Sequence, residues 1–213
     1  MKVLESRLKF FYTLEKYDLP LHNIALPPNH QFSLKRLSDF STGRYCAIKA
    51  LEQLGIQDAI IPIGEDRAPI WPEGIVGSIS HCDSLTGAIV AKRSDHISLG
   101  LDIEEIGRVT PDLWDLVFTE KEKNYLTSLS DKNKLVQSTA IFSIKEAFYK
   151  FQYPLTKTFL DFLDVEVALP DMNRVEIIKA NFILTHSLKN HTIQMLVNKN
   201  LVVIVVCTSE KLQ

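Results

Sequence analysis

The stretch LGLDIE, residues 99–104, sets two acidic residues in a strand that is otherwise apolar. Side chains alternate along a strand, so Asp102 and Glu104 are expected on one face and Leu101 and Ile103 on the other. The two acidic Cα atoms would lie about 7 Å apart, and at an effective dielectric of about 20 their charges would repel by roughly 2 kcal/mol. A bound cation offsets such repulsion, and ligands that are all oxygen suit Mg²⁺. The alternative is a strand end that emerges into solvent at Glu104 and Glu105.

A second stretch, FSIKEAFYK at residues 142–150, has the spacing of a helix. Glu146 and Lys150 are four residues apart and therefore share one helix face. A surface ion pair of this kind contributes only about 0.2–0.5 kcal/mol and is the simple alternative to a functional role. The aromatic residues Phe142, Phe148 and Tyr149 indicate instead that much of this helix is buried.

A third group of motifs carries arginine and histidine beside turns. The motifs are TGR at residues 42–44, RAPIWP at 67–72 and GSISH at 77–81. Arginine binds phosphate oxygens in a fork and histidine also binds them, so Arg44, Arg67 and His81 are candidate phosphate ligands. Taken singly, each of them is better explained as a solvated charge or a turn cap.

The first half of the chain predicts one helix followed by short strands. The apolar pattern indicates a helix over residues 34–54, with Ser33 as its N-cap and Gly55 at its end. Residues 56–73 are rich in Pro and Gly and are expected to form a loop. Strands are then expected at residues 75–80, 86–92 and 97–104.

The second half is expected to begin with helices and to end with strands. Pro111 starts a short helix, and Thr119 starts another with Glu122 in capping-box spacing. A longer helix covers about residues 135–151, with Pro154 beyond its end. The expected strands are 162–169, 175–179, 191–197 and 201–207, and residues 198–200 turn the last hairpin. This order favours an α+β fold with mostly antiparallel sheets.

Composition narrows the function classes. The 213 residues correspond to one domain or two small ones. Hydrophobic residues make up 46% and charged residues 23%, and both values are typical of a globular chain. This composition excludes disorder, collagen and coiled coil as the main state. The formal net charge of −2 argues against nucleic acid as a partner bound through a basic surface. A local basic pocket remains compatible with this balance.

The cysteines and the apolar runs predict a cytoplasmic protein without a membrane span. Cys46, Cys82 and Cys207 are widely separated and form no CxxC pair, so they are interpreted as reduced thiols and not as a zinc site. The charged N-terminal stretch is not that of a signal peptide. The longest apolar run, residues 201–207, is too short to cross a bilayer.

Taken together, the motifs resemble those of the 4′-phosphopantetheinyl transferases. In chain order they are Gly-Arg (43–44), Arg-x-Pro-x-Trp-Pro (67–72), Gly-Ser-Ile-Ser-His (77–81), Gly-x-Asp-Ile-Glu (100–104) and Phe-Ser-x-Lys-Glu-Ala-x-x-Lys (142–150). The resemblance covers about residues 40–168 and is nearest to the enterobactin synthetase component D type within the Sfp-like class. The family often has tryptophan where this chain has Phe142, and residues 1–33 match no motif, although Lys35 and Arg36 are candidates for the basic contacts some relatives make there.

The resemblance implies a fold and a reaction. It implies two similar α/β halves with the active site between them: residues 1–100 with the coenzyme A phosphate and adenine contacts, and residues 101–213 with the metal site, the catalytic helix and the carrier docking surface. The implied enzyme transfers 4′-phosphopantetheine from coenzyme A to a serine of an apo acyl, peptidyl or aryl carrier protein and releases 3′,5′-ADP. A non-catalytic module that binds coenzyme A or a carrier protein is the alternative, and a monomer is expected because Sfp-like chains hold both halves.

The resemblance also implies roles for single residues. Asp102, Glu104 and Glu146 would bind Mg²⁺, or Mn²⁺ in its place, and Glu146 would be the general base, directly or through a metal-held water. Lys150 would bind the phosphate and stabilise or protonate the leaving group. The remaining coenzyme A contacts would come from Arg44, Arg67, Ser80 and His81.

The family tends to meet its carrier protein in the segment after the acidic strand. In this chain the apolar candidates for such a docking ridge are Leu113, Trp114, Leu116, Val117 and Phe118. The alternative is that at least three of these five belong to the core. Carrier proteins are acidic, so Arg108, Lys121 and Lys123 are candidates for a basic rim.

Overall fold

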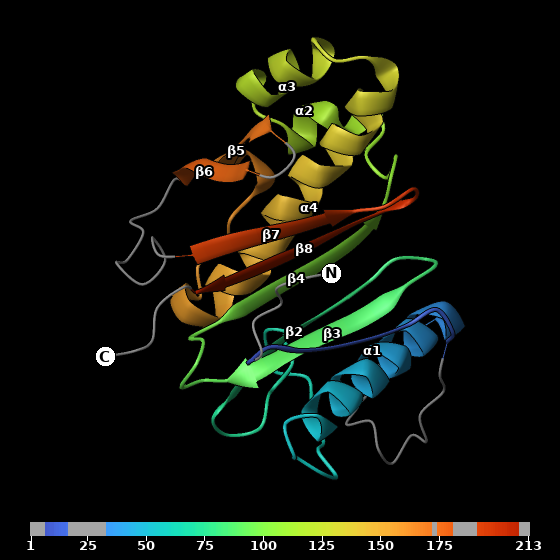
Figure 1. Ribbon diagram of the computed structural model, residues 1–213, viewed down its shortest axis with the longest axis vertical. Helices are drawn as coiled ribbons and strands as arrows, with labels where there is room; N and C mark the ends of the chain where they lie inside the picture. The colour runs from blue at the N-terminus through green and yellow to red at the C-terminus, as the bar shows by residue number, and fades with distance from the viewer. Residues whose placement is uncertain (1–6, 17–32, 172–173, 181–190, 209–213) are drawn as a thin grey trace. The chain divides into compact units, whose positions relative to one another are not determined.

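The computed structural model describes residues 7–16, 33–171, 174–180 and 191–208. These residues form two compact units, one with the residues up to Leu99 and the other with the residues from Gly100 onward (Figure 1). Each unit contains a three-stranded sheet and one long helix. The α+β class and the antiparallel pairing expected from the sequence are confirmed.

The sheet of the first unit has the strand order β1-β3-β2. Its strands are β1 (Lys9–Thr13), β2 (Ile75–His81) and β3 (Thr86–Lys92), and both pairings with the central β3 are antiparallel. β2 and β3 are joined by a tight turn in which the Cys82 N–H donates to the Leu85 carbonyl at 2.8 Å. β1 lies in the N-terminal stretch, where the sequence predicted no element.

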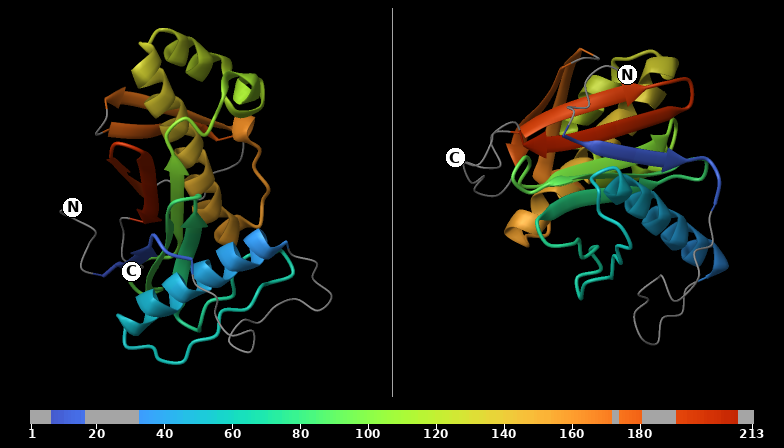
Figure 2. Two further views of the ribbon diagram at one scale, coloured as in Figure 1. Left: turned by 90° about the vertical axis from the view of Figure 1, so that its right-hand side faces the viewer. Right: turned by 60° about the horizontal axis from the view of Figure 1, so that its bottom comes forward.

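Helix α1 (Leu34–Glu52) lies along this sheet, as Figure 2 shows. Ser33 is its N-cap as predicted, and the serine side chain accepts a hydrogen bond from the Arg36 N–H at 3.3 Å. The helix ends two residues earlier than expected, and Gly55 follows with a φ of 82° in the turn after it. A small apolar core joins the helix to the strands; it consists of Cys46, Ala47, Ala50, Leu51, Ile61, Ile75, Ala88 and Val90.

The sheet of the second unit has the order β4-β8-β7. Its strands are β4 (Leu99–Glu105), β7 (His191–Val197) and β8 (Leu201–Thr208). The predicted final hairpin is confirmed, and Asn198 forms its turn: the Asn198 side-chain oxygen accepts from the N–H groups of Asn200 and Leu201, each at 2.9 Å. In this strand order β8 lies between β4 and β7, so it is paired along both of its edges.

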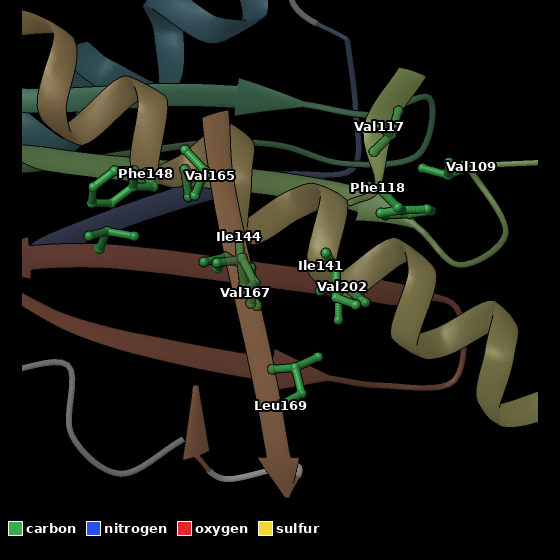
Figure 3. Packing of buried hydrophobic residues seen from close by; sticks show 14 of the residues in the cluster. Val109, Val117, Phe118, Ile141, Ile144, Phe148, Val165, Val167, Leu169 and Val202 are labelled. Atoms are coloured by element: carbon green, nitrogen blue, oxygen red, sulfur yellow. The ribbon is translucent and has the colours of Figure 1, made fainter. Parts of the chain in front are cut away.

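Helices and a small second sheet complete this unit. They are η2 (Pro111–Leu113), α2 (Trp114–Val117), α3 (Glu120–Thr127), α4 (Asp131–Thr156), η3 (Phe162–Asp164), β5 (Val165–Asp171) and β6 (Arg174–Ala180). The capping box predicted at Thr119 and Glu122 is present at the start of α3. The core gathers residues from α4, β5 and β8, among them Ile141, Ile144, Val165, Val167 and Val202 (Figure 3).

Several boundaries in this unit differ from the expectation: β4 begins at Leu99 and not at residue 97, and α4 begins at Asp131 and not at about residue 135. α4 extends to Thr156 and includes Pro154, because a proline in the last turn removes only one hydrogen bond before the helix ends at Lys157, which has a φ of 53°. The segment expected as one strand from residue 162 begins as the short helix η3. Asp161 and Asp164 cap η3 reciprocally, and this polar signal was hidden by the apolar pattern around it.

Two further expectations concern cysteines and membrane spans. Cys46, Cys82 and Cys207 are free thiols, and burial raises the pKa of Cys46 to about 12. Among the described residues, no helix has the length and apolar character needed to cross a membrane.

Candidate active site

The acidic pair of β4 lies in a largely buried strand. Asp102 is only 2% exposed, and its Oδ1 lies 2.7 Å from the Lys150 Nζ of helix α4. Lys150 also donates to the Leu101 carbonyl at 3.1 Å. β4 is buried through Ile103, and Glu104 and Glu105 at its end are half-buried, so Asp102 lies inside the protein and the strand emerges only in part after it.

A glycine allows α4 to approach β4 so closely. A Cβ atom at Gly100 would overlap the Ala147 carbonyl oxygen of α4 and would lie 3.0 Å from the Phe151 Cβ. Any other residue would push the helix from the strand, because the obstacle is backbone and cannot rotate away. Since Ala147 follows Glu146 directly, this contact brings Glu146 to the strand that carries Asp102 and Glu104.

A hydrogen bond fixes the same two elements just past the end of β4. The Gly107 N–H donates to the Thr139 Oγ1 of α4 at 2.9 Å. Gly107 has a φ of 94°, which favours glycine and turns the chain after the strand. The strand and the helix are thus joined at Gly100 and again at Gly107, on both sides of the acidic pair.

The carboxylates of this group influence one another. The pKa of Glu104 is raised to about 7, mainly by burial and also by the nearby charges of Asp102 and Glu146, while Arg108 and Lys150 act against the rise. Burial also raises the pKa of Glu146, with Asp102 adding to the rise and Lys150 opposing it. The structure therefore brings Asp102, Glu104, Glu146 and Lys150 together as one electrostatic cluster, as the two sequence motifs predicted separately.

This cluster fits a hard divalent cation in its donor chemistry. Its three carboxylates supply only oxygen, which Mg²⁺ prefers, and three acidic groups here share two cationic neighbours, Lys150 and Arg108. In the described part of the chain, no group of three or more His, Cys, Asp or Glu side chains stands ready as a complete ligand set. The carboxylates of Glu104 and Glu146 would therefore have to turn toward an ion when it binds.

The residues predicted to bind coenzyme A lie in the first unit. Arg44 of α1 is 7% exposed, its Nε donates to the Ile61 carbonyl at 2.9 Å, and its guanidinium lies 4.2 Å from the centre of the Phe40 ring. Burial lowers the pKa of Arg44 to about 10. Arg44 is thus a buried and hydrogen-bonded cation, and the alternative of a solvated surface charge does not apply to it.

Two close approaches explain why glycine recurs in the motifs of this unit. A Cβ at Gly43 would lie 2.9 Å from Ile79 Cγ2, and a Cβ at Gly77 would lie 2.7 Å from the Trp71 ring. The motifs around Gly43, Trp71 and Gly77 therefore pack against one another within the unit.

The other three predicted ligands lie at different depths. Ser80 is buried near the end of β2, and His81 ends the strand in an exposed position. Arg67 is exposed and has a φ of 65°, which is unusual for a residue other than glycine. Their role toward coenzyme A stays a prediction.

The proposed docking ridge after β4 is mostly core. Val117 and Phe118 are buried, and Trp114 packs half-buried against the same core. This agrees with the alternative that at least three of the five residues belong to the core, and it leaves Leu113 and Leu116 exposed, Leu116 at 66%. The candidates for a basic rim make ion pairs: Arg108 with Glu104 at 3.7 Å, Lys121 with Glu166 at 3.0 Å, and Lys123 with Asp115 at 2.7 Å.

Sequence reasoning gave no role to Gly100, Ala147 or Lys145, although all three stand in the quoted motifs. A glycine inside an apolar strand does signal a close backbone approach, so Gly100 offered a clue. Lys145 offered none, because its partner Glu122 is 23 residues away in sequence.

A cluster of carboxylates with an ammonium, on adjoining elements of an α+β protein, is suited to transfer of a phosphate-containing group. Residues 29–91 match the family model of the 4′-phosphopantetheinyl transferase N-terminal domain, and residues 98–206 match that of the 4′-phosphopantetheinyl transferase superfamily. The chain belongs to this superfamily.

Named relatives agree with this assignment. The chain is 40% identical over 139 residues to the 4′-phosphopantetheinyl transferase Svp of Streptomyces mobaraensis, which covers 64% of this chain and 56% of the relative. It is 33% identical over 149 residues to the enterobactin synthase component D of Escherichia coli (strain K12), which covers 69% and 68%. The chain thus spans little more than half the length of Svp. Among solved structures, it is similar to the Thermotoga maritima holo-[acyl-carrier-protein] synthase with a TM-score of 0.41 and 19% identity, over 53% of this chain and 63% of that one.

Proposed function

We propose that this protein transfers the 4′-phosphopantetheine group of coenzyme A to a serine of an apo carrier protein and releases 3′,5′-ADP. The observation that carries the proposal is the cluster of Asp102, Glu104, Glu146 and Lys150 in a member of this superfamily. A surface ion pair between Glu146 and Lys150 does not account for it, since Lys150 reaches across to Asp102 on β4.

The reaction forms one phosphorus–oxygen bond and breaks another. The serine oxygen of the carrier attacks the phosphorus that bears the pantetheine arm, and the bond from that phosphorus to the bridging oxygen of the pyrophosphate breaks. The serine proton goes to a base, and the electron pair of the broken bond leaves on 3′,5′-ADP. Such a transfer depends on positioning and on neutralisation of charge more than on covalent help from the protein.

Glu146 is suited to accept the serine proton. Its pKa is raised mainly by burial, and a carboxylate with a raised pKa takes up a proton more readily near neutral pH. Lys150, one turn further along α4, offsets the negative charge that develops on the leaving group. The base and the cation thus act from one helix face, as the i,i+4 spacing predicted.

Asp102, Glu104 and Glu146 would hold Mg²⁺, or Mn²⁺ in its place. When bound, such an ion neutralises and orients the pyrophosphate. Arg44, Arg67, Ser80 and His81 are proposed to bind the 3′-phosphate and adenine end of coenzyme A. We thus propose that residues 1–100 supply the contacts to the coenzyme A phosphate and adenine. Residues 101–213 would supply the metal site, the catalytic helix and the carrier docking surface.

The exposed side chains of Leu113 and Leu116 are proposed to contact the carrier protein. The carrier is an acyl, peptidyl or aryl carrier protein, and the enterobactin synthase relative favours siderophore or other secondary metabolism. We also propose that the protein works as a monomer in the cytoplasm, where coenzyme A is present and free thiols persist.

The test is to incubate the protein with coenzyme A, Mg²⁺ and a panel of apo carrier proteins and to measure intact carrier mass. We expect one carrier to gain roughly 340 Da, the mass of the arm moved in this phosphoryl transfer. Glu146→Gln should lower the rate by at least about 100-fold, which is typical for loss of a general base. The matched control is Glu105→Gln, a half-buried neighbour of the acidic pair.

Three results would contradict the proposal or a part of it. A Glu146→Gln protein with normal turnover removes Glu146 from the mechanism, and full rates in excess chelator remove the metal. No mass gain on any carrier, together with tight binding of coenzyme A, would leave the non-catalytic binding module as the better explanation.

A further inference from the structure

Lys145, the residue before Glu146, is buried and holds three separate segments. Its Nζ lies 2.7 Å from Glu122 Oε2, 2.8 Å from the Val117 carbonyl and 2.9 Å from the Phe162 carbonyl. An ammonium group has three N–H donors, and these three acceptors match them. Lys145 thus joins α4 to the end of α2, to α3 and to η3.

Glu122 extends the same connection. Its Oε1 accepts from the Val167 N–H of β5 at 2.8 Å, and its Oε2 also accepts from the Thr119 N–H at 2.8 Å. The side chains of Lys145 and Glu122 are each 1% exposed. The ion pair of Lys145 with Glu122 therefore connects α4 with the end of α2, with α3, with η3 and with β5.

Stability alone is a weak reason for such a pair. Removing two charges from water is costly, and replacing a buried ion pair by apolar side chains of similar volume is often neutral or stabilising. A buried pair can instead select one arrangement among several that apolar packing would tolerate. The arrangement at issue here is the rotation of α4 about its own axis.

We propose that Lys145 is a positioning residue that fixes the rotation of α4 and thereby directs Glu146 and Lys150 toward β4. Successive helix residues point about 100° apart, so a side chain held at position 145 sets the direction of its neighbour Glu146. A rotation of only about 10° would move the tips of those side chains by about 1 Å, and displacements of that size can reduce turnover about 100-fold. The inference rests on the proposed function.

The test compares an uncharged replacement of the pair with the native protein. The double variant Lys145→Met/Glu122→Gln removes both charges and keeps an amide oxygen for the backbone N–H groups of Thr119 and Val167, whereas Lys145→Met alone leaves a buried carboxylate unpaired. Rates are measured below the unfolding transition of each variant, as monitored by circular dichroism. Lys134→Met is the matched control, because Lys134 lies on the same helix and pairs with the exposed Asp131.

We expect the double variant to fold, while kcat falls at least about tenfold for misdirected catalytic groups. Lys134→Met should keep the native kcat. A pair with a purely structural role would instead give a folded double variant with native kcat, and that result overturns the inference.

A second measurement separates this inference from the proposed function. Binding of Mn²⁺ is followed by electron paramagnetic resonance without coenzyme A or carrier, and the double variant is expected to bind several-fold more weakly because Glu146 is displaced from Asp102 and Glu104. Native protein that transfers nothing, yet loses Mn²⁺ affinity in the double variant, contradicts the function and supports the positioning role. Equal Mn²⁺ affinity in the two proteins overturns the positioning role whatever the transfer assay shows.

Discussion

Glu104 makes the stability of the metal-free protein depend on pH. Its pKa rises from an ordinary value of 4.5 to about 7 because the folded protein buries it beside Asp102 and Glu146. The folded state therefore holds the proton more tightly than the unfolded state does. Stability from this group is present at low pH and is lost as pH rises through about 7.

We predict that the free energy of unfolding in chelator falls as pH rises from 4.5 to about 7, by up to about 3 kcal/mol from this group. Glu104→Gln should remove most of that dependence, because the amide cannot ionise. Urea unfolding at a series of pH values measures the change, with Glu105→Gln as the control. Parallel curves for the native protein and Glu104→Gln would show that Glu104 carries no such penalty.

At the scale of elements, the contact between β4 and α4 decides whether the acidic pair meets Glu146. We predict that Gly100→Ala destabilises the second unit by about 1–3 kcal/mol or more, because the new methyl group meets the backbone of Ala147. Thermal unfolding measures the loss.

Gly43→Ala is the comparison for this prediction. There the new methyl group meets the Ile79 Cγ2 at 2.9 Å, a side-chain atom and not backbone, and alanine favours the helix, so a smaller cost than at Gly100 is expected. Equal stability of Gly100→Ala and the native protein would mean that β4 and α4 are not held at this distance.

The sequence predicted elements well where the signals were local. The N-cap at Ser33, the capping box at Thr119 and the turn at Asn198 are each set by a side chain and its near neighbours, and all three were predicted. Contacts between distant parts of the chain were not visible. The pair of Lys145 with Glu122, 23 residues apart in the chain, is one of these.

The candidate site shows the same division. Alternation along β4 and the i,i+4 spacing on α4 predicted the grouping within each element, while the family resemblance joined the two groups. The pairing of Lys150 with Asp102, in place of Glu146, required the structure, because it depends on how closely the helix approaches the strand.

At the scale of the whole molecule, the proposed coenzyme A contacts give a prediction about ligand binding. A ligand that binds only the folded state stabilises it, by about 2.7 kcal/mol at a concentration of 100 times Kd. Coenzyme A should therefore raise the unfolding temperature more than dephospho-coenzyme A, which lacks the 3′-phosphate. In Arg67→Ala, the difference between the two ligands should shrink or disappear.

The comparison of the two ligands is its own control, since a general loss of stability in Arg67→Ala lowers both curves equally. Lys132→Ala, a surface change at the start of α4, should leave the difference intact. An undiminished preference for coenzyme A in Arg67→Ala would remove Arg67 from the 3′-phosphate contacts.

The sequestered amine of Lys145 also has a consequence for chemical labelling. An acylating reagent attacks free, deprotonated amines, so it should modify Lys121, whose side chain is 77% exposed, long before Lys145 at 1%. Modification of Lys145 requires an opening that separates α4 from α3 and η3. Its slow acylation, followed peptide by peptide with mass spectrometry, therefore measures how often the native protein releases its catalytic helix.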